Sequence, residues 1–496
     1  MKILSTAREN MNSTVIETDT AVRVPQGSAM ARSIERTCTT ASSLIAPAFV
    51  AAFAPLVLLT NRKVQRVLLA TLILNIPLQV GNHFFYQEAA EKFGSIGGLE
   101  ISLSNIALAL LYFGWLIQGP SRGLNQRSRS KVTVPALLLV VSYAFSLLVA
   151  TDVILGIFEV WKVLELFLLY VYIANTVTSR DDMLFVVRLL LIGLIIEASL
   201  MLAQAAGLVG DFNLWGLRAK TDLDGSGRIS GNMGSPNLAA SYLAMSMTVA
   251  LGVMFARVTR ADKFLSGVGL GMATIPLIST MSRGGWIAFC VGVSVIAMSY
   301  GLRNRLKAVA SALLFIIVLA IPFAAQIQER LSGDDYGAAA SRIPLNKIAF
   351  LMIEDHPLFG VGANNFPVAM APYVSRGFLG EFLYTVHNKY LVVCAETGIW
   401  GLIAFVWLLI AIIYQGLRCA RLHDPLLSAL AVGFTAAVLG LMAHMFFDVF
   451  REGSAYRLLW IFGGLGVAMN RMTTGPIRTG VYVTTRRTTR ATCSSM

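Results

Sequence analysis

The chain has 496 residues, of which 56% are hydrophobic and only 14% are charged. A soluble globular domain carries about 25% charged residues, so this composition excludes an ordinary soluble protein. The formal net charge is +13, but most Lys and Arg residues lie in short segments between apolar runs, where they mark the cytoplasmic side of a membrane protein. We therefore expect a lipid bilayer as a partner and no nucleic acid. The five cysteines are scattered and predict neither a disulfide framework nor a zinc site.

The two ends of the chain are polar. Residues 1–42 are rich in Thr and Ser and predict a mobile polar tail, and residues 471–496 predict a basic cytoplasmic tail. Between them we expect the N-terminal part of a transmembrane bundle at 43–325, a large periplasmic loop at 326–388 and the C-terminal part of the bundle at 389–470.

Apolar runs recur along nearly the whole chain. About 20 apolar residues cross a hydrocarbon core of about 30 Å, and a chain in lipid must satisfy its backbone internally, which favours helices. We therefore predict an all-α polytopic membrane protein, a bundle of about 12–13 transmembrane helices with one large outward-facing loop. The predicted segments are 43–60, 66–80, 103–118, 134–150, 156–178, 184–206, 236–257, 264–281, 285–301, 308–325, 389–416, 425–447 and 456–470.

Basic clusters alternate with loops that contain few Lys or Arg residues, and the basic loops are assigned to the cytoplasm. The loops predicted to face outward are 81–102, 207–235, 282–284, 326–388 and 448–455. This count also places the N-terminus outside, in conflict with its own arginines; a further hairpin segment near residue 50 would resolve the conflict. The aromatic and apolar residues of the long loop predict a folded cap with short helices.

Three of the outward stretches combine glycines with basic or amide side chains. They are GSGRISGNMGSPN with Arg228, STMSRGGWIAF with Arg283, and the long loop, which contains Arg342 and ends at His387 in the stretch YTVHNKYLVV. Glycine turns let backbone N–H groups approach an anion, and arginine binds phosphate oxygens in a bidentate manner. An imidazole accepts and donates protons near neutral pH.

Each feature also has an ordinary explanation. An arginine at a helix end commonly extends toward lipid headgroups, and a single histidine at a helix start is commonly a capping residue. Their conjunction on the side predicted to face outward favours chemistry on a substrate at the membrane surface.

The segments SRGGWIAF, DHPLFGVGANNF and HNKYLVVCAETGIWG occur in an order and spacing that resemble the O-antigen ligase and Wzy-type polysaccharide polymerase superfamily of bacterial membrane glycosyltransferases. The resemblance covers roughly residues 215–415. It implies a helical bundle in the bacterial inner membrane and a donor glycan carried on undecaprenyl diphosphate. The acceptor it implies is a glycan or a lipid-A core sugar, with other polysaccharide-assembly proteins as further partners.

The resemblance also implies roles for individual residues. His387 corresponds to the histidine of the HN motif and is the expected catalytic residue, followed by Asn388. Arg283 corresponds to the arginine of the SRGG turn, and Arg228 and Arg342 match arginines in outward loops. We expect Arg228, Arg283, Arg342 and Asn388 to bind substrate.

The chemistry of glycan transfer is compatible with these residue types. Arginines can stabilise a departing diphosphate without a metal ion, and a neutral histidine can deprotonate the acceptor hydroxyl. Attack opposite the leaving group inverts the anomeric centre. We expect no cofactor and no metal, although Asp334–Asp335 and Glu354–Asp355 leave a divalent-cation site as an alternative.

Charged residues within the apolar segments support a rival function. Glu159, Lys162 and Glu165 share one helix side and can neutralise one another, and Glu197 lies deep in its segment. A charged pathway of this kind is typical of a transporter or flippase of lipid-linked oligosaccharides. An inactive scaffold for polysaccharide assembly is a third alternative.

Overall fold

The computed structural model describes residues 58–118, 130–208, 212–214, 217–219, 228–300, 328, 342–374, 384–451 and 453–474. The predicted segment at 308–325 lies outside the described residues, and so does the segment at 43–60 apart from its last three residues. The tail at 1–42 and nearly all of the tail at 471–496 also lie outside them. The following description concerns the unit that begins at Leu59.

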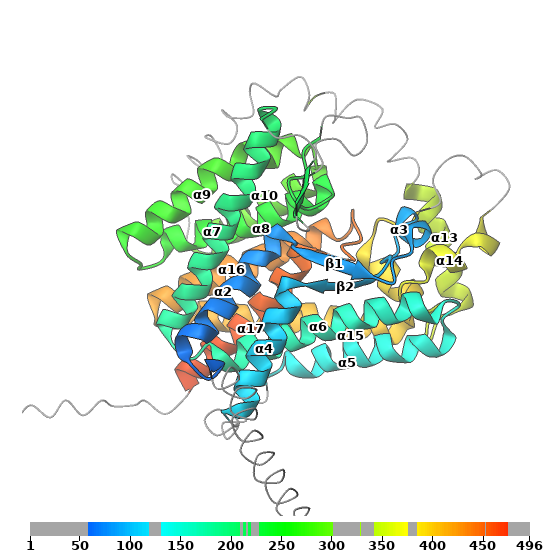
Figure 1. Ribbon diagram of the computed structural model, residues 1–496, viewed down its shortest axis with the longest axis horizontal. Helices are drawn as coiled ribbons and strands as arrows, with labels where there is room; N and C mark the ends of the chain where they lie inside the picture. The colour runs from blue at the N-terminus through cyan, green and yellow to red at the C-terminus, as the bar shows by residue number, and fades with distance from the viewer. Residues whose placement is uncertain are drawn as a thin grey trace, which may run out of the picture. The chain divides into compact units, whose positions relative to one another are not determined.

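This unit is built almost entirely from helices (Figure 1). Eleven of the predicted apolar segments each coincide with one long helix of the described residues, which confirms the all-α membrane class. The α-helices are α2 (Arg62–Leu78), α3 (Glu88–Lys92), α4 (Leu103–Ile117), α5 (Thr133–Ser146), α6 (Val153–Thr176), α7 (Arg180–Ala205), α8 (Pro236–Phe255), α9 (Arg260–Ser279), α10 (Arg283–Ser299), α13 (Arg342–Asp355), α14 (Phe366–Ala369), α15 (Lys389–Ala420), α16 (Pro425–His444) and α17 (Ser454–Thr474). Short 3₁₀ helices follow α5 (Leu147–Val149) and α14 (Ala371–Tyr373).

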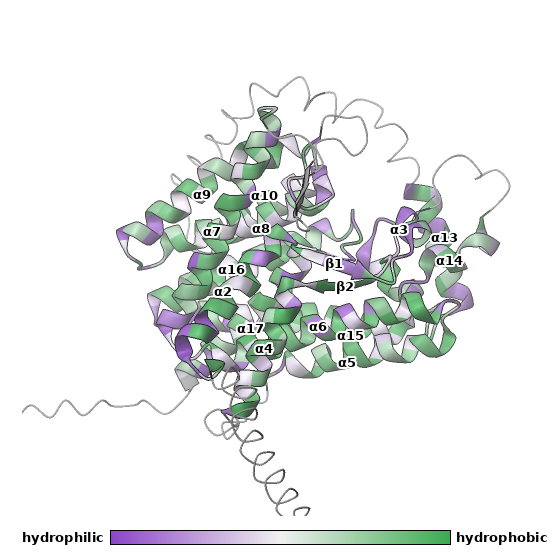
Figure 2. Ribbon diagram, in the orientation of Figure 1, coloured by the Kyte–Doolittle hydropathy of each residue, from purple (hydrophilic) through white to green (hydrophobic). Residues whose placement is uncertain are grey.

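Four of these helices, α7, α8, α15 and α16, are long and apolar enough to cross a membrane by length and composition. Shorter apolar helices occupy Leu103–Ile117, Thr133–Val149 and Arg283–Ser299. Hydrophobic colour covers most of the long helices, whereas hydrophilic colour gathers around α3 (Figure 2). The protein is therefore an integral membrane protein with its polar residues concentrated in the connections.

Two small antiparallel hairpins lie in the loops predicted to face outward. Strands β1 (Gly81–Phe84) and β2 (Leu99–Ser102) pair with His83 opposite Glu100, and β3 (Phe212–Leu214) pairs with β4 (Leu217–Ala219). Periodicity over four or three residues is too short to reveal a strand, so the sequence analysis did not anticipate them. The first hairpin forms one wall of the cavity described below.

Small residues allow the central helices to approach closely. α8 packs against α9, α10 and α16, and the backbones of α8 and α16 meet at Gly252 and Gly433. On α10, Gly285 faces Ala240 of α8 without room for a side chain between them. Close backbone approach is a common way for membrane helices to gain packing energy. It brings the N-terminal end of α10 and the C-terminal end of α16 together.

Helix α15 is broken near its start. Gly398 has φ 68° and ψ −171°, so the helix consists of a short N-terminal piece and a longer piece after the break. The PLFGVG segment, residues 357–362, fills the break: the Val361 N–H donates to the Ala395 carbonyl at 2.9 Å, and the Gly362 N–H donates to the Glu396 carbonyl at 3.0 Å. The Ile399 N–H donates in turn to the Pro357 carbonyl at 2.9 Å. The loop thus satisfies backbone groups that the broken helix leaves unpaired.

The two asparagines of the same block fasten it to distant parts of the chain. Asn364 is buried, accepts from the Ile96 N–H at 2.7 Å and donates to the Leu155 carbonyl at 3.0 Å. Asn365 accepts from the Asp152 N–H at 2.7 Å. The glycines and asparagines of this loop thus have a structural role: the block joins α15, the start of α6 and the segment between the hairpin strands.

Candidate functional site

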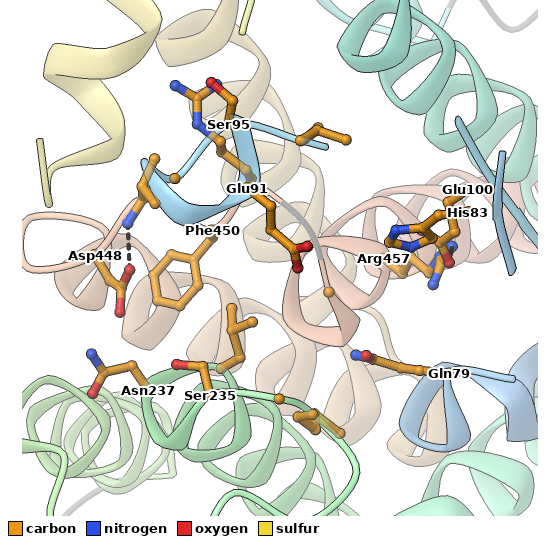
Figure 3. A pocket seen from close by; sticks show the side chains of 18 of the residues that line it. Gln79, His83, Glu91, Ser95, Glu100, Ser235, Asn237, Asp448, Phe450 and Arg457 are labelled. Atoms are coloured by element: carbon orange, nitrogen blue, oxygen red, sulfur yellow. Dashed lines mark hydrogen bonds and ion pairs between the residues drawn. The ribbon is translucent and has the colours of Figure 1, made fainter. Parts of the chain in front are cut away.

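A cavity of about 370 Å³ opens among the loops predicted to face outward. Its lining comes from residues 79–100, 232–238, 384–387 and 448–457, so four such loops, separated in sequence, meet there. Figure 3 shows Asp448, Asn237 and Ser235 on one side of the view, and His83, Glu100 and Arg457 on the other. The volume lies within the range of roughly 300–1,000 Å³ that is usual for small-molecule sites.

His387 lines this cavity next to Asp448. Its Nδ1 atom lies 3.8 Å from Oδ1 of Asp448, and its ring stacks on Tyr384 with centroids 5.2 Å apart. Among the described residues, Nδ1 of His387 has no hydrogen-bond partner. Burial alone would raise the pKa of the Asp448 carboxyl, but His387, then His444 and the Val449 N–H, hold this pKa below its ordinary value. The carboxylate therefore remains charged beside the imidazole at neutral pH.

The backbone on both sides of His387 is fixed. The Thr385 N–H donates to the Phe93 carbonyl at 3.0 Å, and the Lys389 N–H donates to the Met445 carbonyl at 2.9 Å. Asn388 is the N-cap of α15, and its Oδ1 accepts from the Tyr390 and Leu391 N–H groups at 3.0 and 3.1 Å. The structure thus gives the amide oxygen of Asn388 a capping role, which positions the residue before it.

Arg228 reaches the edge of the cavity. It donates to the Thr280 carbonyl at 2.9 Å and to Oδ1 of Asn237, a lining residue, at 3.0 Å. The following turn is anchored to α7, because Oε1 of the buried Glu197 accepts from the Asn232 N–H at 3.0 Å. Glu197 therefore holds the glycine-rich loop in place from inside the bundle.

Arg283 and Arg342 lie near the same end of α16, although neither lines the cavity. Arg283 begins α10, and the next residue, Gly284, packs directly against the ring of His444 at the end of α16. Nδ1 of His444 lies 2.7 Å from the Ser241 hydroxyl. Arg342 is close enough to His444 to act on it electrostatically, and His444 acts in the same way on Asp448. A chain of neighbouring groups thus connects both arginines with the wall that carries Asp448.

Two further arginines, which the sequence analysis did not single out, line the cavity from the segment after α16. Arg451 forms a bidentate pair with Glu396, at 2.9 and 2.5 Å, and also contacts Glu159 at 2.9 Å. Burial alone would lower the pKa of Arg451, but Glu396 and Glu159 raise it above its usual value. Lys389 lies 3.9 Å from Glu159 and completes this buried cluster.

Arg457 is at the centre of a second buried cluster. It contacts Glu100 of β2 at 3.1 Å and Glu165 of α6 at 3.3 Å, and Lys162 pairs with the same two carboxylates. Burial alone would raise the pKa of the Glu100 carboxyl, but Arg457 and Lys162 hold this pKa below its ordinary value. The expected neutralisation within α6 thus holds for Lys162 and Glu165, whereas Glu159 pairs with Arg451.

A signal for these arginines was present in the sequence. Acids within apolar segments, such as Glu165 and Glu396, require basic partners, because an unpaired charge in the bilayer is costly. Arg451 and Arg457 stand at the start of the next helix and supply those partners. Which acid meets which base depends on helix packing, which the spacing of residues along one segment does not specify.

The structure does not assemble a metal site in the part it describes, where no group of three or more His, Cys, Asp or Glu side chains is arranged to hold an ion. Glu354 and Asp355 lie exposed at the end of α13. Asp334 and Asp335 fall outside the described residues.

We compared the chain with models of known protein families. Residues 268–406 match the family model described as O-Antigen ligase (Wzy_C). The match supports the resemblance of this region to the O-antigen ligase family. The matched residues include Arg283, Arg342, His387 and Asn388, and also the break at Gly398 and the loop that fills it. No curated protein matches the chain.

The match to the O-antigen ligase model confirms, over residues 268–406, the resemblance seen in the three motifs. It supports glycan transfer of the ligase or polymerase type in general, with a lipid-linked glycan and the bilayer as partners in general. Arg228, Asp448, Arg451 and Arg457 lie outside the matched residues, so their place in the site comes from the structure alone.

Proposed function

We propose that this protein transfers a glycan from an undecaprenyl-diphosphate carrier to a hydroxyl acceptor at the periplasmic face of the bacterial inner membrane. The observation that carries the proposal is the position of His387 beside Asp448 in a cavity lined by loops predicted to face outward. The membrane-length helices and the family match support the same conclusion.

In the proposed reaction His387 is the general base. With its proton on Nδ1, facing the Asp448 carboxylate, the imidazole presents Nε2 as the atom that accepts a proton. As the acceptor oxygen bonds to the anomeric carbon, its proton passes to Nε2. The bond from the anomeric carbon to the diphosphate oxygen breaks, and the diphosphate leaves with the electron pair. Attack from the opposite face inverts the anomeric centre, and no metal ion takes part.

The leaving diphosphate requires positive charge. We assign diphosphate binding to Arg228, Arg283 and Arg342, the arginines of the three outward stretches that combine glycines with basic side chains. Guanidinium groups bind phosphate oxygens in a bidentate manner and stabilise charge that develops in the transition state. Asn388 contributes by capping α15 and so orienting His387.

The test is transfer by purified protein with a defined lipid-linked donor. We expect His387→Ala to lose transfer by about 10²- to 10⁴-fold, the usual contribution of a general base. His356→Ala is the matched control, because His356 is an exposed histidine of the same predicted loop and should leave the rate unchanged. Normal transfer by His387→Ala would remove this residue from the mechanism.

The acceptor separates a ligase from a polymerase. In a deletion strain, loss of polymer with single repeats still on the surface lipid indicates a polymerase, whereas polymer stranded on its carrier indicates a ligase. The transporter alternative rested on the charges within α6 and on Glu197 of α7, which accepts from the Asn232 N–H in the structure. The charges of α6 are paired with Arg451, Arg457 and Glu100, which removes the observation that favoured it.

A further inference from the structure

The charged groups in and beside the cavity are unevenly distributed. Arg228 bonds to Asn237 on the α8 side, and Arg283 and Arg342 lie near the adjacent end of α16. The opposite wall, from the β1–β2 hairpin and α3, presents Glu91 and Glu100. Figure 3 shows the Glu91 side chain projecting between the Asp448 side and the Glu100 side of the view. The charge of Glu100 is offset by Arg457 and Lys162, whereas the exposed Glu91 carboxylate repels a diphosphate. The hairpin wall is therefore suited to the uncharged part of a substrate.

Carboxylates, amides and imidazoles bind sugar hydroxyls well, because each hydroxyl offers a donor and acceptor positions. On the hairpin, His83 lies opposite Glu100 in the strand register. Glu91 is held by a hydrogen bond from the Tyr86 hydroxyl. Ser95 also lines this wall. The hairpin and the segment between its strands therefore present several groups that can bind sugar hydroxyls.

Two buried polar atoms indicate that the cavity is built to hold a polar ligand. Oδ1 of Asn232 and Nε of Arg451 belong to lining residues that are only 4% and 6% exposed. Neither atom has a hydrogen-bond partner among the described residues. A buried polar atom without a partner is costly and rare in folded proteins. A small shift of either side chain would let a hydroxyl group of a bound ligand reach the unpaired atom.

Space for a ring is available beside these atoms. Gly234 lines the cavity at φ 67°, and a Cβ added there would meet no atom within 4 Å. The wall continues to the base: Gly94 packs against Tyr384, whose ring stacks on His387. A sugar bound along the hairpin wall therefore lies in the same cavity as the imidazole that would deprotonate it.

We propose that the hairpin wall, formed by His83, Glu91, Ser95 and Glu100 with Asn232, is the subsite for the acceptor sugar. It binds the hydroxyl groups of an uncharged glycan and presents one of them to His387. The diphosphate of the donor lies on the arginine side. This assignment rests on the proposed function and adds to it the location of the acceptor.

The test measures KM for the acceptor and KM for the donor separately. Glu91→Gln and His83→Ala are measured with a defined lipid-linked donor and two acceptors, a purified lipid-A core and a second lipid-linked repeat. We expect KM for the acceptor that the wild type uses to rise about tenfold, as for one or two lost hydrogen bonds. The KM for the donor and kcat should remain unchanged. Because both side chains are exposed, folding should not be affected.

Glu88→Gln is the matched control, since Glu88 lies on the same short helix as Glu91, pairs with Lys92 in solvent and does not line the cavity. An unchanged acceptor KM in both variants, or a rise in the donor KM instead, overturns the subsite while wild-type transfer still supports the proposed function. Absence of transfer by the wild type with either acceptor overturns the proposed function and the subsite with it.

Discussion

The arginines around the cavity fall into two groups that differ in what faces them. Arg451 is held by Glu159 of α6 and Glu396 of α15, and Arg457 by Glu100 of β2 and Glu165 of α6. Arg228 instead bonds to a carbonyl and an amide at the cavity edge, and Arg283 and Arg342 lie at helix starts near α16. A buried ion pair joins elements of the fold, whereas an arginine at the edge of a site can meet a substrate anion. The comparison predicts that the first group acts on stability and the second on activity.

The Arg451 cluster offers the strongest test of the first half of this comparison. Glu396→Ala removes the bidentate partner of Arg451 and leaves Glu159 to face both Arg451 and Lys389, so the buried cluster keeps one uncompensated positive charge, which typically costs about 3–5 kcal/mol. We expect a large fall in the free energy of unfolding, measured by thermal or denaturant unfolding in detergent micelles. Glu354→Ala, at an exposed glutamate of α13, is the control. Unfolding at the wild-type midpoint would show that the pair does not stabilise the fold.

Substitution of Arg283 tests the prediction that the second group of arginines acts on activity. We expect Arg283→Ala to lower kcat for transfer by about 10²- to 10³-fold, as for the loss of one group that stabilises transition-state charge. Its unfolding midpoint should stay close to that of the wild type. Arg283→Lys should recover only part of the rate, because lysine lacks the bidentate fork. Equal turnover by Arg283→Lys and the wild type would show that charge alone is needed there.

The break in α15 fixes the short helical piece before Gly398. This piece carries Glu396, the partner of Arg451, and it begins two residues after His387. Gly398→Ala places a Cβ against the Leu358 carbonyl at a backbone conformation that only glycine adopts readily. We expect a cost of about 1–3 kcal/mol in the free energy of unfolding. Gly267→Ala on α9 is the matched control, because a Cβ there meets no atom within 4 Å. Similar unfolding of the two variants would refute a required break.

The smallest expected effect is the contribution of Asp448 to the free energy of unfolding, which changes with pH only in the acidic range. The folded-state pKa of Asp448 is lowered below the ordinary aspartate value of 3.8, so its charge stabilises the folded protein above that pH. This contribution is lost as the pH falls through the folded pKa. Unfolding measured from pH ~7 to pH ~3 should therefore show wild type losing its advantage over Asp448→Asn only below about pH 4. A difference that disappears between pH ~5 and ~7 would contradict the lowered pKa.

Hydrophobic runs predicted the helices well, because lipid leaves a buried backbone no alternative to internal hydrogen bonds. Eleven runs match helices of the described residues within a few residues at each end. The motif histidine and the outward arginines could also be identified from the sequence, and the roles assigned to them remain predictions. The partners of these residues were not identifiable. Asp448 lies far from His387 in sequence, and only the packing of α15 and α16 brings the two together.

The hairpin at residues 81–102 was not predicted for a different reason. Its strands are four residues long, and the intervening segment is held by contacts from elsewhere, such as Asn364 and Thr385. Local sequence carries little information about an element that distant residues stabilise. The same holds for the PLFGVG segment, whose extended course makes sense only once the break at Gly398 is known.

The union of that segment with α15 also constrains the order in which the protein can be made. Residues 357–362 leave the ribosome before residues 395–399, yet their backbone groups bond to each other. The earlier segment therefore remains without these partners until the later helix has been synthesised. Maturation of the cavity is consequently a late event in biosynthesis, and a chain truncated before Gly398 would expose an incomplete surface to the quality-control machinery of the cell.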